Sequence, residues 1–104
     1  MKTDILQSIT ERLREVLPLG AHAILFGSRA RGDARHDSDW DVLILLDKPK
    51  TESADYDNVS YPLVELGWSL NECISPVLYT FKDWVKQHFT PFYHNVKDEG
   101  IRLV

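Results

Sequence analysis

Two apolar segments restrict the possible folds of this 104-residue chain most strongly, because each one adjoins a short polar motif. The segment 23–26 runs into a glycine-rich turn that begins at Gly27. The segment 42–46 follows directly after Asp39-Trp40-Asp41. Short apolar runs bounded in this way are typical of buried strands, and the unbroken run 42–46 indicates a central strand covered on both faces. We therefore expect the glycine turn and the two aspartates at the same end of a small sheet.

The spacing of apolar residues and turn formers predicts the other elements. In chain order we expect a helix over 4–17, a strand over 21–26, a short helix from 28, a strand over 40–46, a helix over 59–70, a strand over 73–79, a short helix after 80 and a last helix from 91 to Gly100. Residues 47–57 are expected to form a loop. Helices and strands in this order predict an α/β (α+β) fold, and a chain of this length is expected to make a single domain, residues 1–104.

Individual residues mark where some of these elements begin or lie. Asp4, with a glutamine three residues later, predicts the capped start of the first helix. Thr80, with Asp83 after it, predicts a second capped start. Pro76 cannot donate a backbone hydrogen bond, so we expect the strand over 73–79 at the edge of the sheet.

Composition excludes several functional classes. The net charge of -4 disfavours a nonspecific nucleic-acid surface, which would need clustered lysines and arginines. Cys73 is the only cysteine, so a disulfide framework is excluded, and we expect it to be buried filler in its strand. No apolar run is long enough to cross a bilayer, and the N-terminal segment is amphipathic rather than signal-like. We therefore expect a cytoplasmic protein with no membrane partner.

Four aromatic residues in the C-terminal half have helical spacing: Trp68, Trp84, Phe89 and Phe92. We expect most of them in the core. A domain of this size cannot bury all of them, and any exposed ones would form a surface for a partner.

Asp39 and Asp41 are two residues apart at the start of a strand, so we expect both carboxylates on one side of the sheet and Trp40 on the other. Two carboxylates, completed by phosphate oxygens and water, satisfy the octahedral coordination that Mg²⁺ prefers. Such a site stabilises the charge on a phosphoryl or nucleotidyl group during transfer. We expect Asp39 and Asp41 to be the metal ligands, with Mg²⁺ as the ion and Mn²⁺ as the alternative.

The glycine turn complements this metal site. Gly27 allows the backbone to approach a phosphate closely, and the hydroxyl of Ser28 can bond a terminal phosphate. Three arginines follow in the same segment, and the planar guanidinium group suits phosphate: Arg29, Arg31 and Arg35. Neither motif alone is specific, but their order and their attachment to two strands favour a joint metal and phosphate site.

The residues 24–32 together with 38–42 resemble the signature of the polymerase-β-type nucleotidyltransferases, and most closely their minimal, single-domain MNT branch. The resemblance covers residues 24–46. It implies a mixed sheet with helices packed on it, with ATP or another NTP bound over the glycine turn. The residues expected to bind nucleotide are Gly27, Ser28, Arg31 and Ser38. Asp39 and Asp41 correspond to the family's metal ligands.

The same resemblance implies the activity. Members of the family transfer a nucleoside monophosphate and release pyrophosphate, and minimal members are commonly antitoxins paired with a helical HEPN-domain toxin. Some such antitoxins adenylylate the toxin on a tyrosine hydroxyl. We therefore expect an enzyme that moves AMP from ATP, with magnesium, to a hydroxyl of a HEPN-type partner. The nucleotide, the acceptor, the oligomeric state and the existence of a toxin partner are left open by the residues.

One departure from the family pattern bears on catalysis. Active members usually carry a third carboxylate on the later strand, where it draws the proton from the attacking hydroxyl. Here Ser75 stands near that position, and Glu72 is the nearest acid and the candidate third catalytic residue; Glu65 is a poorer one. The alternative function is a weakly active or inactive antitoxin that neutralises its partner by binding. A phosphohydrolase using the same aspartates lacks a positioned base or nucleophile.

Overall fold

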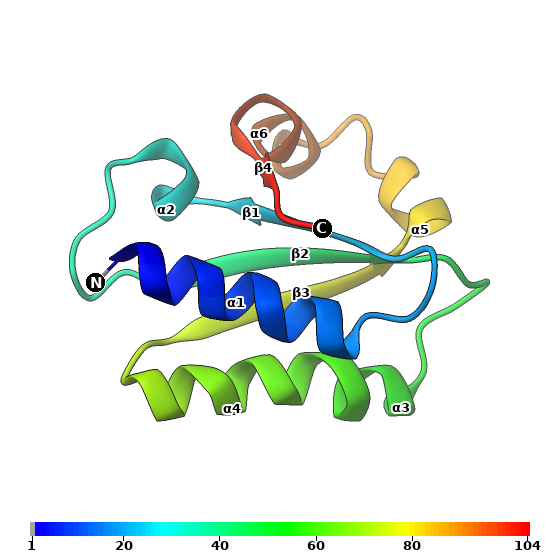
Figure 1. Ribbon diagram of the computed structural model, residues 1–104. Helices are drawn as coiled ribbons and strands as arrows, with labels where there is room; N and C mark the ends of the chain where they lie inside the picture. Colours follow the sequence, from blue (N-terminus) through cyan, green and yellow to red (C-terminus); the bar gives the residue numbers. More distant parts are fainter. Residues whose placement is uncertain (1) are drawn as a thin grey trace.

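Four strands form a mixed sheet in the computed structural model, which describes residues 2–104 (Figure 1). The strands are β1 (His22–Phe26), β2 (Trp40–Leu46), β3 (Ile74–Thr80) and β4 (Ile101–Arg102), and their order in the sheet is β3-β2-β1-β4. β1 is antiparallel to both β2 and β4, whereas β2 and β3 are parallel. The mixed sheet and the edge position of β3 are therefore confirmed.

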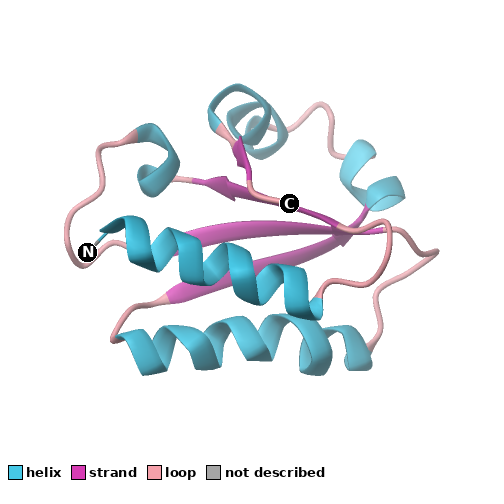
Figure 2. Ribbon diagram, viewed as in Figure 1, coloured by secondary structure: helices cyan, strands magenta, loops and turns pink. Residues whose placement is uncertain are grey.

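Helices cover both faces of this sheet (Figure 2). One face carries α1 (Lys2–Val16) and α4 (Tyr61–Leu70), and the other carries α5 (Phe81–Val85) and α6 (Pro91–Glu99). The four-residue helix α2 (Ser28–Arg31) follows the end of β1. No helix in the described part of the chain, residues 2–104, combines the length and apolar character that a membrane crossing requires.

β2 separates two apolar cores, as its unbroken apolar run predicts. Trp40, Val42 and Ile44 face the core formed with α1 and α4. Leu43 and Leu45 face a second core, which contains Trp84 of α5. Because side chains alternate along a strand, the even positions near Trp40 and the odd positions near Asp41 lie on opposite faces. The aspartates therefore belong to the face on which α5 and α6 pack.

Two helix starts differ from the sequence-based prediction. α1 begins at Lys2, so Asp4 lies inside the helix and is not its cap. Residues 53–57 were expected in a loop, but α3 (Ser53–Asp55) and the π-helical turn η1 (Tyr56–Ser60) lead directly into α4. The wide π turn directly precedes Tyr61-Pro62, where proline cannot continue the usual helical hydrogen bonds. The cap predicted at Thr80 is confirmed, since its side chain accepts from the Asp83 amide.

The expected burial of the aromatic residues is only partly confirmed. Trp84 is buried and Phe92 is half-buried. Trp68 and Phe89 are 65% and 76% exposed, so half of the four are exposed, whereas most were expected in the core. α4 approaches the start of β3 through Gly67, where an added Cβ atom would lie only 2.8 Å from the Glu72 carbonyl oxygen. The next residue, Trp68, is exposed, and its ring lies edge-to-face with that of Tyr61 on α4, with ring centroids 6.0 Å apart.

The Asp55 side chain forms hydrogen bonds at the start of the helical segment 53–70, and we expect these bonds to stabilise the fold. Its buried carboxylate accepts hydrogen bonds from the Glu52 amide at 2.7 Å and from Lys48 Nζ at 3.0 Å. Burial acts to raise the pKa of Asp55, but these hydrogen bonds outweigh it and leave the pKa below its ordinary value. We expect Asp55→Asn to lower the free energy of unfolding by about 1–2 kcal/mol at pH 7.

The pH dependence of this effect follows from the sign of the shift. A lowered folded-state pKa contributes stability that is present above the unfolded value and is lost as pH falls through the folded value. The difference between wild type and Asp55→Asn in urea unfolding should therefore shrink as pH falls below about 4. Asp57→Asn, an exposed acid two residues further on, is the control and should show no such pattern. A difference that stays constant with pH would contradict the ionic role of Asp55.

Candidate functional site

The glycine turn and the strand that carries Asp41 meet at one end of the sheet. β1 ends at Phe26, which pairs with Asp41, so the next residue, Gly27, passes directly beside the start of β2. Gly27 has φ 77° and ψ -159°, a conformation that is essentially restricted to glycine. A Cβ atom at Gly27 would also overlap the Asp41 carboxylate. Glycine is therefore required here for two reasons, and the predicted proximity of the two motifs is confirmed.

Asp39 and Asp41 form a pair of carboxylates on the face opposite Trp40. Asp39 is exposed and Asp41 is half-buried. The pKa of Asp41 is raised, first by burial and then by the nearby charge of Asp39, while the charge of Arg31 lowers it. Two like charges this close are relieved by a bound cation, and their oxygen atoms suit a hard divalent ion.

Ser75 of β3 completes this side of the site. In the parallel register of β2 and β3, Ser75 lies opposite Asp41. Its hydroxyl Oγ donates to Asp39 Oδ2 at 3.2 Å. The position where the resemblance implies a third carboxylate is thus occupied by a serine that contacts a proposed metal ligand.

Cys73 lies beside the same carboxylate. It is exposed, so the prediction that it fills the core was wrong. Its Sγ lies 4.0 Å from Ser75 Oγ, and the pKa of the thiol is raised by its contact with the Asp39 carboxylate and by partial burial. A raised pKa keeps the thiol protonated and poorly nucleophilic at neutral pH.

A metal ion would depend on ligands from outside the protein. Within residues 2–104, which the structure describes, no group of three or more histidine, cysteine, aspartate or glutamate side chains is arranged to hold a metal. The Asp39–Asp41 pair supplies two carboxylates, and an octahedral ion would take its remaining ligands from substrate phosphates and water. The geometry therefore fits an ion that binds together with a nucleotide.

The Glu72 carboxylate contacts Trp40 and Arg29 rather than Asp39 or Asp41. Its Oε1 accepts a hydrogen bond of 2.7 Å from Trp40 Nε1 and lies 3.7 Å from Arg29 Nη2. Trp40 faces the core under α1 and α4, so these contacts hold the Glu72 carboxylate on the side of the sheet away from Asp41. The structure therefore does not support the assignment of Glu72 as the third catalytic carboxylate, since that carboxylate is already engaged elsewhere.

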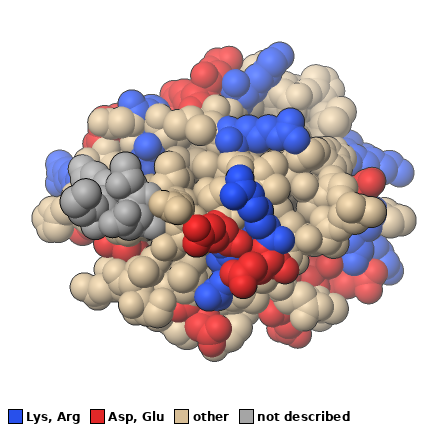
Figure 3. Space-filling model, in the orientation of Figure 1, with Lys and Arg blue, Asp and Glu red and all other residues tan. Residues whose placement is uncertain are grey.

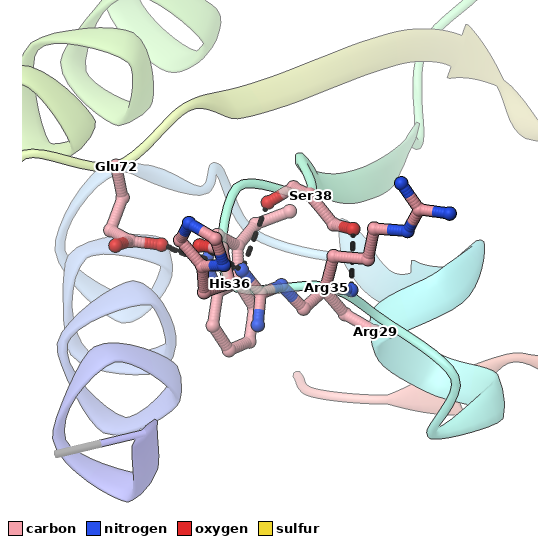
Figure 4. A network of polar contacts seen from close by, with 6 residues as sticks. Arg29, Arg35, His36, Ser38 and Glu72 are labelled. Carbon is pink, nitrogen blue, oxygen red and sulfur yellow. Dashed lines mark hydrogen bonds and ion pairs between the residues drawn. The ribbon is translucent and has the colours of Figure 1, made fainter.

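Arg29 and Arg31, two arginines of the turn, differ in exposure. Arg29, which the sequence suggests as a phosphate contact, is directed under the loop and is only 5% exposed (Figure 4). Arg31 is exposed on the site side and forms ion pairs of 3.2 Å with both Asp33 and Glu99. These two acids raise the pKa of Arg31. Because its charge also reaches Asp41, Arg31 is the better placed of the two for an anionic substrate.

Ser38, a predicted nucleotide contact, forms hydrogen bonds within its own loop. Its Oγ accepts from the Arg35 amide at 2.9 Å and closes the turn 35–38, while its carbonyl accepts from Arg29. The face of the molecule seen in Figure 3 carries acidic and basic side chains interspersed, without a continuous basic stripe among the residues drawn in colour. Ser28 follows Gly27 as the first residue of α2, as the motif implies.

Comparisons with known proteins identify the family and the fold. A chain in the crystal structure of a toxin–antitoxin with AMP-PNP superposes with a TM-score of 0.64 at 20% identity, over 95% of this chain and 72% of that one. A mutant of the toxin–antitoxin pair MntA–HpeT, with two aspartates changed to glutamate, gives 0.61 at 19%, over 95% and 72%. The complex of a tri-AMPylated HEPN toxin from Shewanella oneidensis with MNT antitoxin gives 0.59 at 19%, over 100% and 72%. No curated protein sequence matches the chain.

The family model for the nucleotidyltransferase domain matches residues 6–99, a span that includes the glycine turn, both aspartates and all of β3. This span covers most of the chain. The protein therefore belongs to the nucleotidyltransferase domain family.

Proposed function

We propose that this protein is a magnesium-dependent nucleotidyltransferase that transfers AMP from ATP to a hydroxyl of a small helical HEPN-type toxin and so acts as its antitoxin. The observation that carries the proposal is the contact of the glycine turn with the metal-ligand strand: Gly27 lies against the Asp41 carboxylate, and the charge of Asp39 reaches the same group. Two structural neighbours support it, one solved with AMP-PNP and one containing a tri-AMPylated HEPN toxin.

Each residue of the site has a role in this reaction. Asp39 and Asp41 would hold Mg²⁺, with Mn²⁺ as the alternative, and the ion supplies stabilisation of the charge that develops on the transferring group. Gly27 and Ser28 bind the triphosphate through the turn, and Arg31 contributes positive charge at the same side. The acceptor hydroxyl gives its proton to water, its oxygen bonds to the α-phosphorus, the bond from that phosphorus to the bridging oxygen of the β-phosphate breaks, and pyrophosphate leaves with that oxygen.

A specific observation favours a second function. The residue opposite Asp41 on β3 is Ser75, which has no charge with which to draw the proton from an acceptor hydroxyl. An antitoxin with little or no turnover, which neutralises its toxin by binding, fits this feature. Both functions use the same fold, and they differ in whether the aspartates are needed for protection.

The direct test uses a small helical HEPN-type protein as the acceptor partner. We expect incubation of both proteins with ATP and Mg²⁺ to add one or more AMP groups to the partner, detected by intact mass measurement and accompanied by pyrophosphate release. An unmodified partner in a stable complex would refute transfer and leave neutralisation by binding as the function.

The turn itself offers a matched pair of variants, Gly27→Ala and Gly32→Ala. Both glycines have positive φ, 77° and 87°, so each substitution introduces backbone strain of about 1–3 kcal/mol, and the strain is larger at Gly27, whose ψ of -159° places it in a region essentially restricted to glycine. At Gly32 an added Cβ meets nothing within 4 Å, whereas at Gly27 it overlaps the Asp41 carboxylate. We expect only Gly27→Ala to displace the metal ligand.

The measurement is the rise in melting temperature that Mg²⁺ with a nonhydrolysable ATP analogue produces, since a ligand stabilises the folded state that binds it. Gly32→Ala should melt at a lower temperature than wild type but keep this ligand-dependent rise. Gly27→Ala should melt lower still and lose the rise. A full ligand-dependent rise in Gly27→Ala would show that the close approach to Asp41 is dispensable for binding.

A further inference from the structure

Arg29 is enclosed rather than presented to the site. Its Nη2 donates to the Ser38 carbonyl at 3.0 Å and to the His36 carbonyl at 3.3 Å (Figure 4). Its Cζ lies 4.4 Å from the centroid of the Trp40 ring. With the side chain 5% exposed, the guanidinium cannot reach a phosphate bound at the outer side of the turn.

Trp40 and Glu72 complete the enclosure. Trp40 Nε1 donates to Glu72 Oε1 at 2.7 Å, and the same oxygen lies 3.7 Å from Arg29 Nη2. A buried guanidinium needs a counterion, and this carboxylate is the only acid paired with it among the described residues. We refer to Arg29, Trp40 and Glu72 as the clamp.

The clamp holds the backbone on both sides of Asp39. Ser38 precedes Asp39 and is held through its carbonyl, whereas Trp40 follows it and is held through its ring. Arg29 itself stands directly after Gly27-Ser28 in the chain. The clamp therefore connects the turn expected to bind phosphate with the loop expected to bind metal.

We propose that Arg29 is a positioning residue, which acts through Ser38, Trp40 and Glu72 to fix Asp39 relative to the Gly27 turn. The inference rests on the proposed function for its effect on the reaction, but the clamp itself is a property of the fold. Metal and phosphate ligands must be held within about 0.5 Å of their working geometry, and their supporting contacts are as important as the ligands. Lysine cannot replace Arg29, because one ammonium group cannot stack flat on the ring while donating to two carbonyls.

The first measurement does not depend on activity. The amides of Ser38 and Trp40 donate to the carbonyls of Arg35 and Cys73, so their hydrogen exchange reports whether the loop is held. We expect Arg29→Met, Arg29→Lys and Glu72→Gln to accelerate exchange at these two amides about tenfold or more, with the strand amides of β1 unchanged. Arg14→Met, an exposed arginine on α1, is the matched control and should leave the loop unchanged.

The second measurement separates positioning from substrate binding. A positioning role predicts a kcat lowered about 10–100-fold in the three clamp variants, with the KM for ATP nearly unchanged. A raised KM, an unchanged kcat and unchanged loop exchange in Arg29→Met would overturn the proposal and identify Arg29 as a phosphate contact.

Two further outcomes are distinguishable. If Arg29→Met does not fold, Arg29→Lys and the nearly isosteric Glu72→Gln carry the test, and wild-type exchange in both would overturn the clamp. If the wild-type protein transfers no AMP, the proposed function fails while the exchange measurement still decides whether Arg29 holds the loop.

Discussion

The double variant Asp39→Asn, Asp41→Asn is expected to lose about a thousandfold or more of the AMP-transfer rate while keeping its fold. Asparagine has nearly the same shape as aspartate but no charge, so the variant replaces two anionic carboxylate ligands by neutral amide oxygens, which bind a hard divalent ion much more weakly. Loss of stabilisation for developing charge has effects of this size in other enzymes. Transfer is measured as the mass increase of the HEPN partner and as released pyrophosphate.

The same variant should be at least as stable as wild type when no metal is present. Burial and the charge of Asp39 raise the folded-state pKa of Asp41, so the ionised form of Asp41 opposes folding at neutral pH. Substitution by asparagine removes that cost, and the gain should vanish at low pH, where Asp41 is protonated. Urea unfolding in EDTA at pH 7 and at pH 3 measures this. A strongly destabilised variant would mean that the carboxylates support the fold rather than a metal.

Asp37→Asn serves as the control, because Asp37 is an exposed acid in the same loop. It should transfer AMP at the wild-type rate.

Protection of cells from the toxin by the double variant Asp39→Asn, Asp41→Asn decides between the two proposed functions. If the double variant still protects, neutralisation proceeds by binding; if it forms the complex but does not protect, neutralisation needs transfer.

The core of the fold could be predicted because strands and helices leave a periodic pattern of apolar residues. The run 42–46 identified the central strand, and Pro76 identified the edge strand, since both reflect local constraints on backbone hydrogen bonding and burial. Two elements left no such pattern. β4 is two residues long, and the segment 53–60 is helical because of a cap at Glu52 and a π turn rather than an apolar repeat.

The sequence allowed a prediction that the glycine turn and the two aspartates lie close together, but not which side chains hold them in place. Gly27, Asp39 and Asp41 are brought together because the strand ends on which they lie are paired, which follows from chain order. The direction of a long side chain depends on tertiary contacts instead. Arg29 and Glu72 have charges that fit phosphate binding and catalysis, yet both turn toward Trp40, and no spacing in the sequence indicates this. Their shared proximity to Trp40 becomes visible only in the folded chain.

Ser75→Asp is expected to raise the rate of AMP transfer about a hundredfold, the lower end of what a positioned proton acceptor contributes. Ser75 already lies opposite Asp41 in the register of β2 and β3, and its Oγ is 3.2 Å from Asp39 Oδ2. A carboxylate at this position would join the metal-binding face and accept the proton of the attacking hydroxyl. The rate is measured with the HEPN partner, ATP and Mg²⁺, and Ser75→Asn, which has the same shape without the charge, should show no gain.

The melting temperature of Ser75→Asp tests whether the new carboxylate acts through ion binding. A third carboxylate beside Asp39 and Asp41 adds like-charge repulsion, so Ser75→Asp should melt below wild type in EDTA. Mg²⁺ with a nonhydrolysable ATP analogue should then raise its melting temperature more than it raises that of wild type, because the added carboxylate strengthens ion binding. A variant that gains ion-dependent stability but no transfer would show that the third carboxylate alone does not restore turnover, and would favour neutralisation by binding. A variant that gains neither would show that the Ser75 side chain does not face the ion at all.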